Sequence, residues 1–116
     1  HGVLTDPRPM YAKVHVIATA SYHEGLSTVC IESGACGRPV IGSSIYGVKE
    51  TIVDGETGLL FKIKNVTDFI DKIQNIACLS TDNRIKMGIK ARRKVELDFD
   101  REQVVFSYNA LIKIII

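Results

Sequence analysis

Apolar residues change their spacing along the chain, and the change separates expected strands from expected helices. Three short runs are almost continuously apolar, which is typical of buried strands. They span residues 14–19, 39–42 and 58–61. Elsewhere apolar residues recur every three or four positions, which predicts helices that bury one face. These helices are expected near 10–13 and over 28–36, 66–77, 82–97 and 101–112.

Local signals define the ends of the helix expected over 28–36. Ser27 is a suitable N-cap, because its hydroxyl can accept a hydrogen bond from a backbone N–H of the first turn. Gly37 can adopt the left-handed conformation that ends a helix, and Pro39 prevents continuation. Residues 48–53 are expected to form one helical turn, followed by a tight turn at Asp54-Gly55.

Strands that alternate with helices predict a parallel sheet of the doubly wound type. The expected fold class is α/β, a Rossmann-like parallel sheet with flanking helices in a single domain over 1–116. Such a domain usually has about five or six strands, and its first strand–helix turn carries much of the ligand chemistry. We therefore expect the N-terminal part of the domain to be missing. An uncovered strand edge, or the apolar residues 111–116, would then favour self-association.

Composition narrows the range of functions. Of 116 residues, 46% are hydrophobic and 24% are charged, which is typical of soluble globular domains. The net charge of +2 is too small to indicate a nucleic-acid partner. The three cysteines lack CxxC spacing, so we expect buried free thiols and a reducing, cytoplasmic compartment. No spacing of His, Cys, Asp and Glu indicates a metal site, and no cofactor is expected.

Two glutamates stand where such a fold binds ligands. Glu24 lies in the loop after the first strand, and Glu32 lies on the helix that Ser27 caps. The N-terminus of that helix attracts a diphosphate, and Gly25 allows a ligand to approach the backbone closely. The simpler alternative is that Glu24 is a capping acid and Glu32 a solvated side chain. The apolar neighbours of Glu32 argue for a binding role, because an unpaired carboxylate among them would be costly.

The segments around these glutamates resemble a known family. Residues 21–27 (SYHEGLS) and 32–41 (ESGACGRPVI) are similar to the glutamate-seven-glutamate signature of family 4 of the retaining glycosyltransferases. Residues 47–60 (GVKETIVDGETGLL) resemble the family's next block, and Met87-Gly88 and Phe99-Asp100 its C-terminal end. The chain departs from the pattern at Ala20, where the family usually has proline, and at His15, where aspartate is common.

The resemblance implies a two-domain GT-B enzyme, of which this chain is the C-terminal, nucleotide-sugar-binding part. It implies that Glu24 acts at the donor sugar, that Glu32 accepts hydrogen bonds from the ribose, and that the backbone of Leu4 lies beside the base. The sugar and diphosphate would be held by backbone groups of four consecutive residues: Gly25, Leu26, Ser27 and Thr28. The family's basic pair that grips the diphosphate lies upstream and has no equivalent here.

The expected reaction is transfer of a sugar, with retention, from a nucleotide-sugar donor, expected to be UDP-linked. The acceptor would be a glycan or lipid-linked molecule of envelope or capsule synthesis, bound through the absent N-terminal domain. An alternative is a non-catalytic nucleotide-sugar-binding module that works with a separate acceptor-domain chain. The basic residues of 86–94 form either a solvated helix face or a contact with anionic lipid at the inner face of the membrane.

Overall fold

The computed structural model describes residues 2–116, which form three strands and five helices. In chain order these elements are α1 (Arg8–Lys13), β1 (Ile17–Thr19), α2 (Thr28–Ala35), β2 (Val40–Ser43), β3 (Gly58–Phe61), α3 (Val66–Ala77), α4 (Thr81–Asp98) and α5 (Arg101–Ile115). The strands make one parallel sheet in the order β1-β2-β3. The predicted α/β fold with a parallel sheet and flanking helices is therefore confirmed for the described residues.

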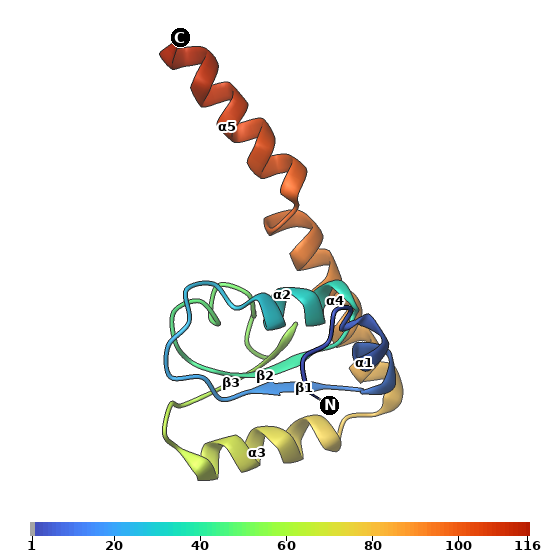
Figure 1. Cartoon of the computed structure of the whole chain (residues 1–116). Helices are drawn as coiled ribbons and strands as arrows, with labels where there is room; N and C mark the ends of the chain where they lie inside the picture. The colour runs from blue at the N-terminus through green and yellow to red at the C-terminus, as the bar shows by residue number, and fades with distance from the viewer. Residues whose placement is uncertain (1) are drawn as a thin grey trace.

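Helices cover both faces of the sheet (Figure 1). α3 lies along one face, and α2 lies on the opposite face, packed against α4. α5 projects away from this body, and every one of its residues is exposed. Two clusters of buried side chains form the core, one centred on Val40 and Val48 and the other on Ile41 and Phe61.

Glycine residues allow α2 and α4 to cross closely. A Cβ built on Gly88 of α4 would overlap the backbone oxygen of Gly37, at the end of α2. A Cβ on Gly34 would lie 2.7 Å from Cγ2 of Val95. Only a residue without a side chain lets the two backbones approach in this way. The contact sets the position of α2, and therefore the position of its N-terminus.

The predicted ends of α2 are confirmed. The hydroxyl of Ser27 accepts a hydrogen bond from the backbone N–H of Cys30 at 3.4 Å. Gly37 has φ +67°, and its N–H donates to the carbonyl of Gly34 at 2.8 Å. The N–H of Arg38 donates to the carbonyl of Ser33 at 2.8 Å, which completes a Schellman motif.

Two local predictions are wrong in extent. The first strand begins at Ile17, whereas the apolar run suggested 14–19, because pairing with β2 starts where the N–H of Ile17 donates to the carbonyl of Pro39. Residues 48–51 form turns, residues 52–53 are irregular, and the expected helical turn is not present. Thr51 directs both its N–H and its hydroxyl to the carbonyl of Val48.

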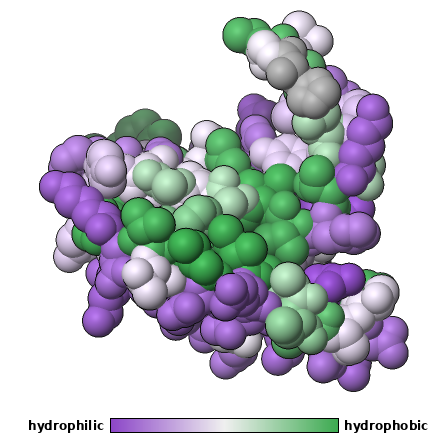
Figure 2. Space-filling model, turned by 90° about the horizontal axis from the view of Figure 1, so that it is seen from below, coloured by the Kyte–Doolittle hydropathy of each residue, from purple (hydrophilic) through white to green (hydrophobic). Residues whose placement is uncertain are grey.

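The burial of the cysteines also differs from expectation. All three are free, but only Cys30 is buried, while Cys36 is half-buried and Cys78 exposed. Cys78 follows the last residue of α3, whose apolar face is only partly covered: the side chains of Ile70 and Ile73 are 46% and 40% exposed. Figure 2 shows a continuous apolar band on the side of the molecule where α3 lies.

Candidate functional site

Glu24 is held at the carboxyl end of the sheet by a hydrogen bond from Ser21, which is itself hydrogen-bonded to the last residues of β1 and β2. The hydroxyl of Ser21 donates to Oε1 of Glu24 at 2.8 Å and lies 3.3 Å from the hydroxyl of Thr19, the last residue of β1. The backbone carbonyl of Ser21 accepts from the hydroxyl of Ser43, the last residue of β2, at 2.6 Å. The half-buried carboxylate of Glu24 is thus tied to two adjacent strands.

The loop after β2 supports the loop that carries Glu24. The carbonyl of Gly47 accepts a hydrogen bond from the N–H of Ser27 at 2.8 Å. Gly47 has φ +80°, and a Cβ there would lie 2.5 Å from the carbonyl oxygen of Gly25 and 2.9 Å from that of Glu24. Position 47 therefore requires glycine both for its conformation and for the space available. Sequence reasoning assigned no supporting role to Gly47, although it lies within the second family-like block.

The N-terminus of α2 adjoins this loop and is accessible. Gly25, Leu26 and Thr28 are exposed, while the Ser27 cap is buried. The first turn of α2 contains no acidic residue, so its positive end is not neutralised from within the helix. The structure thus brings Glu24 together with the backbone groups expected to hold a sugar and a diphosphate.

Glu32 is exposed, so the apolar residues beside it in sequence do not enclose its carboxylate. The residues of α2 that face the core are Cys30, Ser33 and Gly34, so Glu32 points outward despite the apolar residues beside it in sequence. Oε2 of Glu32 accepts a hydrogen bond of 3.0 Å from the hydroxyl of Tyr11, a buried residue of α1. No sequence signal linked these two residues, which are 21 positions apart.

The same environment changes the acidity of Tyr11. Burial, together with the hydrogen bond to the Glu32 carboxylate, raises the pKa of Tyr11 to about 12. Burial also raises the pKa of the Cys30 thiol, which disfavours the nucleophilic thiolate form. Tyr11 therefore acts as a hydrogen-bond donor that positions Glu32.

The raised pKa of Tyr11 predicts a loss of stability in alkali. Because the folded-state pKa lies above that of the unfolded chain, the stabilisation is complete below pH 10 and is lost as pH rises toward about 12. Urea unfolding midpoints measured between these pH values should fall more steeply for the wild-type chain than for Tyr11→Phe. Apart from Tyr11 the two proteins carry the same ionisable side chains, so equal slopes would show that Tyr11 contributes nothing.

Leu4 has no hydrogen bond to this cluster among the described residues. It belongs to the exposed segment before α1, and its own side chain is 43% exposed. Within residues 2–116, no backbone hydrogen bond joins Leu4 to the glutamate loop or to α2. His23, next to Glu24, is exposed.

Metal-binding clusters and membrane-spanning helices are both absent from residues 2–116. No group of three or more His, Cys, Asp or Glu side chains in this range is placed to hold a metal ion. No helix in this part of the chain combines the length and the apolar character needed to cross a bilayer.

Comparisons with known proteins identify the family of the chain. Residues 2–94 match the family "Glycosyl transferases group 1". The chain is 33% identical over 113 residues to the lipopolysaccharide core biosynthesis glycosyltransferase LpsE of Rhizobium meliloti, covering 96% of this chain and 32% of that protein. It is 30% identical over 117 residues to the capsular polysaccharide biosynthesis glycosyltransferase CapM of Staphylococcus aureus, covering 95% and 30%. The chain thus spans about a third of the length of these relatives.

Solved structures share the fold. Sucrose-phosphate synthase from Thermosynechococcus elongatus superposes on 91% of the chain with a TM-score of 0.84 and 29% identity, using 26% of its own length. HepE from Anabaena, solved with UDP and glucose, superposes on 87% with a TM-score of 0.74 and 21% identity, using 29% of its length. The chain also covers 53% of a solved C-terminal domain from Francisella tularensis LpcC, with 87% of its residues, a TM-score of 0.73 and 23% identity.

The sheet, the helices around it and the loop that carries Glu24 therefore occur within a recognised sequence family. The solved structures that resemble the chain are glycosyltransferases with the GT-B fold. The family match extends over most of the residues, from the segment before α1 into α4. On this evidence the chain belongs to the glycosyl transferases of group 1.

Proposed function

We propose that the chain is the C-terminal, donor-binding part of a retaining, family 4 glycosyltransferase that transfers a sugar from a nucleotide-sugar donor. The observation that carries the proposal is the position of Glu24, which Ser21 holds beside the accessible N-terminus of α2. A fixed carboxylate next to a positive helix end provides one group for a sugar and another for a diphosphate. Membership of the family supports a transferase activity.

In this proposal the donor lies across the N-terminus of α2. The backbone groups of Gly25, Leu26, Ser27 and Thr28 bind the sugar and diphosphate, and Glu24 acts at the reacting sugar. Glu32, held by Tyr11, accepts hydrogen bonds from the ribose hydroxyls. Charge on the departing diphosphate is stabilised by the helix end, which acts where the charge develops.

The donor is proposed to be a UDP-sugar, and no metal or cofactor takes part in the proposed reaction. HepE, whose fold the chain shares, was solved with UDP. The acceptor is a glycan or lipid-linked molecule, in line with the lipopolysaccharide and capsule syntheses for which LpsE and CapM are named. A second domain provides the acceptor site. A lipid-linked acceptor would bring the enzyme to the inner face of the membrane.

Donor binding is tested by Glu32→Gln. The variant should weaken the affinity for UDP-sugar by roughly 1–1.5 kcal/mol, because a neutral amide oxygen replaces the charged acceptor of the ribose hydrogen bonds. Calorimetric titration with a panel of nucleotide sugars measures the change and identifies the preferred donor. Glu56→Gln, in the exposed turn before β3, removes the same charge away from the site and is the matched control.

The result must separate a local effect from a change in overall charge. If Glu32→Gln and Glu56→Gln reduce affinity equally, Glu32 does not contact the ribose. If the preferred donor binds both variants as tightly as it binds wild type, the proposed donor site is wrong.

A further inference from the structure

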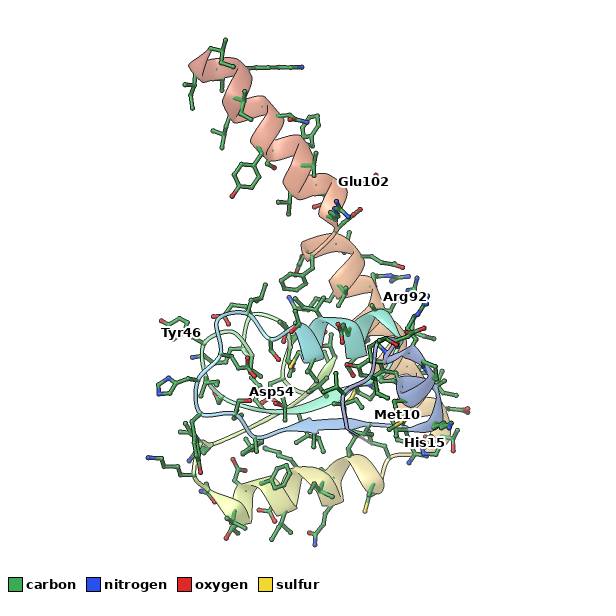
Figure 3. All side chains as sticks on the ribbon, in the orientation of Figure 1. Met10, His15, Tyr46, Asp54, Arg92 and Glu102 are labelled. Carbon is green, nitrogen blue, oxygen red and sulfur yellow. The ribbon has the colours of Figure 1, made fainter. Side chains whose placement is uncertain are left out.

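A cavity of about 640 Å³ opens at the end of the sheet opposite Glu24. His15, which precedes β1, and Pro39, which precedes β2, place it at the amino ends of the parallel strands. Figure 3 shows His15 and Arg92 at the end of the molecule away from Tyr46, whose loop supports the Glu24 loop. The volume lies within the range of small-molecule sites.

Positive charge dominates the lining of this cavity. Four of its residues are arginines: Arg38, Arg84, Arg92 and Arg93. The carboxylate that also lines it, Glu96, accepts a hydrogen bond from Nε of Arg92 at 2.8 Å. Thr81, the first residue of α4, also lines the cavity, but Asp82 in the same turn offsets the positive end of this helix. The lining therefore carries more positive than negative charge.

Three of the arginines are held in place by backbone carbonyls at the ends of helices. Nε of Arg38 donates to the carbonyl of Tyr11 at 2.8 Å. Nη1 of Arg84 donates to that of Leu79 at 3.1 Å, and Nη1 of Arg92 to that of Ala35 at 2.8 Å.

These hydrogen bonds fix the positions of the three arginines, but they use only some of the N–H groups of each guanidinium. A guanidinium group has five N–H donors, and the hydrogen bonds to protein atoms use one or two in each of these three arginines. The remaining N–H groups belong to side chains that are already partly immobilised. Binding an anion therefore costs less side-chain entropy than it would with free arginines.

An apolar wall completes the cavity. Ile85 and Ile89 lie one turn apart on α4, line the cavity, and are 55% and 56% exposed. Pro39 lies on the same lining and is itself buried. Fixed guanidinium donors beside exposed aliphatic side chains suit a ligand with a compact anionic group and a less polar body.

We propose that this cavity binds a small soluble phosphate ester, with the arginines holding the phosphate and Ile85 and Ile89 covering its carbon skeleton. Arginine donors match the geometry of phosphate oxygens. The site is separate from the proposed donor site, because the two lie at opposite ends of the sheet. A cavity of this volume suits a small soluble molecule, whereas a lipid bilayer would meet the protein over a broad outward surface.

The proposal is tested by titrating the ¹⁵N-labelled 116-residue chain with glucose 1-phosphate at constant ionic strength. Amide signals of Gly37, Thr81 and Arg84 should shift in a saturable manner. Arg93→Gln should weaken this binding about tenfold, the effect of losing one hydrogen bond to a charged group. Lys86→Gln removes the same charge from α4 outside the cavity and should leave the affinity unchanged.

Three outcomes would overturn the proposal. One is a titration in which these amides do not shift, or in which shifts are confined to residues 25–28 at the donor site. Another is an equal loss of affinity in Arg93→Gln and Lys86→Gln, which would indicate attraction to overall charge. The third is cosedimentation with phosphatidylglycerol vesicles without any response to glucose 1-phosphate. Loss of donor binding in Glu32→Gln is measured separately and leaves this test unaffected.

Discussion

Glu24→Gln is expected to lower kcat of the transferase that contains this chain by about 10²- to 10³-fold, the usual effect of removing one group that stabilises developing charge. KM for the donor should change little, because the diphosphate and ribose contacts remain. Glutamine preserves the shape of the side chain and can still accept the hydrogen bond from Ser21. Steady-state kinetics with the preferred UDP-sugar would measure both parameters.

The control for this result is again Glu56→Gln, which should retain wild-type kcat. Circular dichroism of both variants would show whether the fold is preserved. A Glu24→Gln enzyme with near-normal kcat would rule out a role at the reacting sugar. A rise in KM with unchanged kcat would show that Glu24 binds substrate and transition state equally.

Gly88→Ala is expected to destabilise the chain by about 2 kcal/mol or more, although alanine favours helices over glycine by about 1 kcal/mol. The added Cβ would overlap the carbonyl oxygen of Gly37 and lie 3.6 Å from Cδ of Pro39. The first of these neighbours is backbone, so relief requires the helices to separate. Urea unfolding followed by circular dichroism would give the change in free energy.

Gly25→Ala is the comparison for this variant, because a Cβ at position 25 meets nothing within 4 Å. It should lie within about 0.5 kcal/mol of wild type in stability, as is usual for surface substitutions. If Gly88→Ala were as stable as Gly25→Ala, the close crossing of α2 and α4 would not be a constraint on the fold.

Much of the fold could be predicted because its signals are local. The cap at Ser27, the stop at Gly37 and the strand over Gly58–Phe61 each depend on neighbouring residues, and each is confirmed. The start of β1 could not be predicted in the same way. It depends on where β2 begins beyond Pro39, which is a property of the pairing between strands.

In the candidate site, too, local features could be predicted from the sequence and features that depend on tertiary packing could not. The sequence directed attention to Glu24 and Glu32 through their spacing around one helix. The apolar residues beside Glu32 in sequence did not indicate its environment, because the face of α2 that is buried consists of Cys30, Ser33 and Gly34 while Glu32 faces solvent. The positions of Tyr11 and Gly47 come from tertiary packing, which brings α1 to Glu32 and the loop after β2 to Gly25.

The short length of α2 has a mechanical consequence. Its eight residues make a rod about 12 Å long, with Ser27 at one end and Gly37 at the other. A helix of this length is too short to bend appreciably, so its two ends translate together. Because the backbone of Gly37 packs closely against Gly88, we expect a shift of α4 at the arginine-lined cavity to be passed along α2 to its Ser27 end. The arginine-lined cavity and the proposed donor site are therefore linked through one short helix and the contact between Gly37 and Gly88.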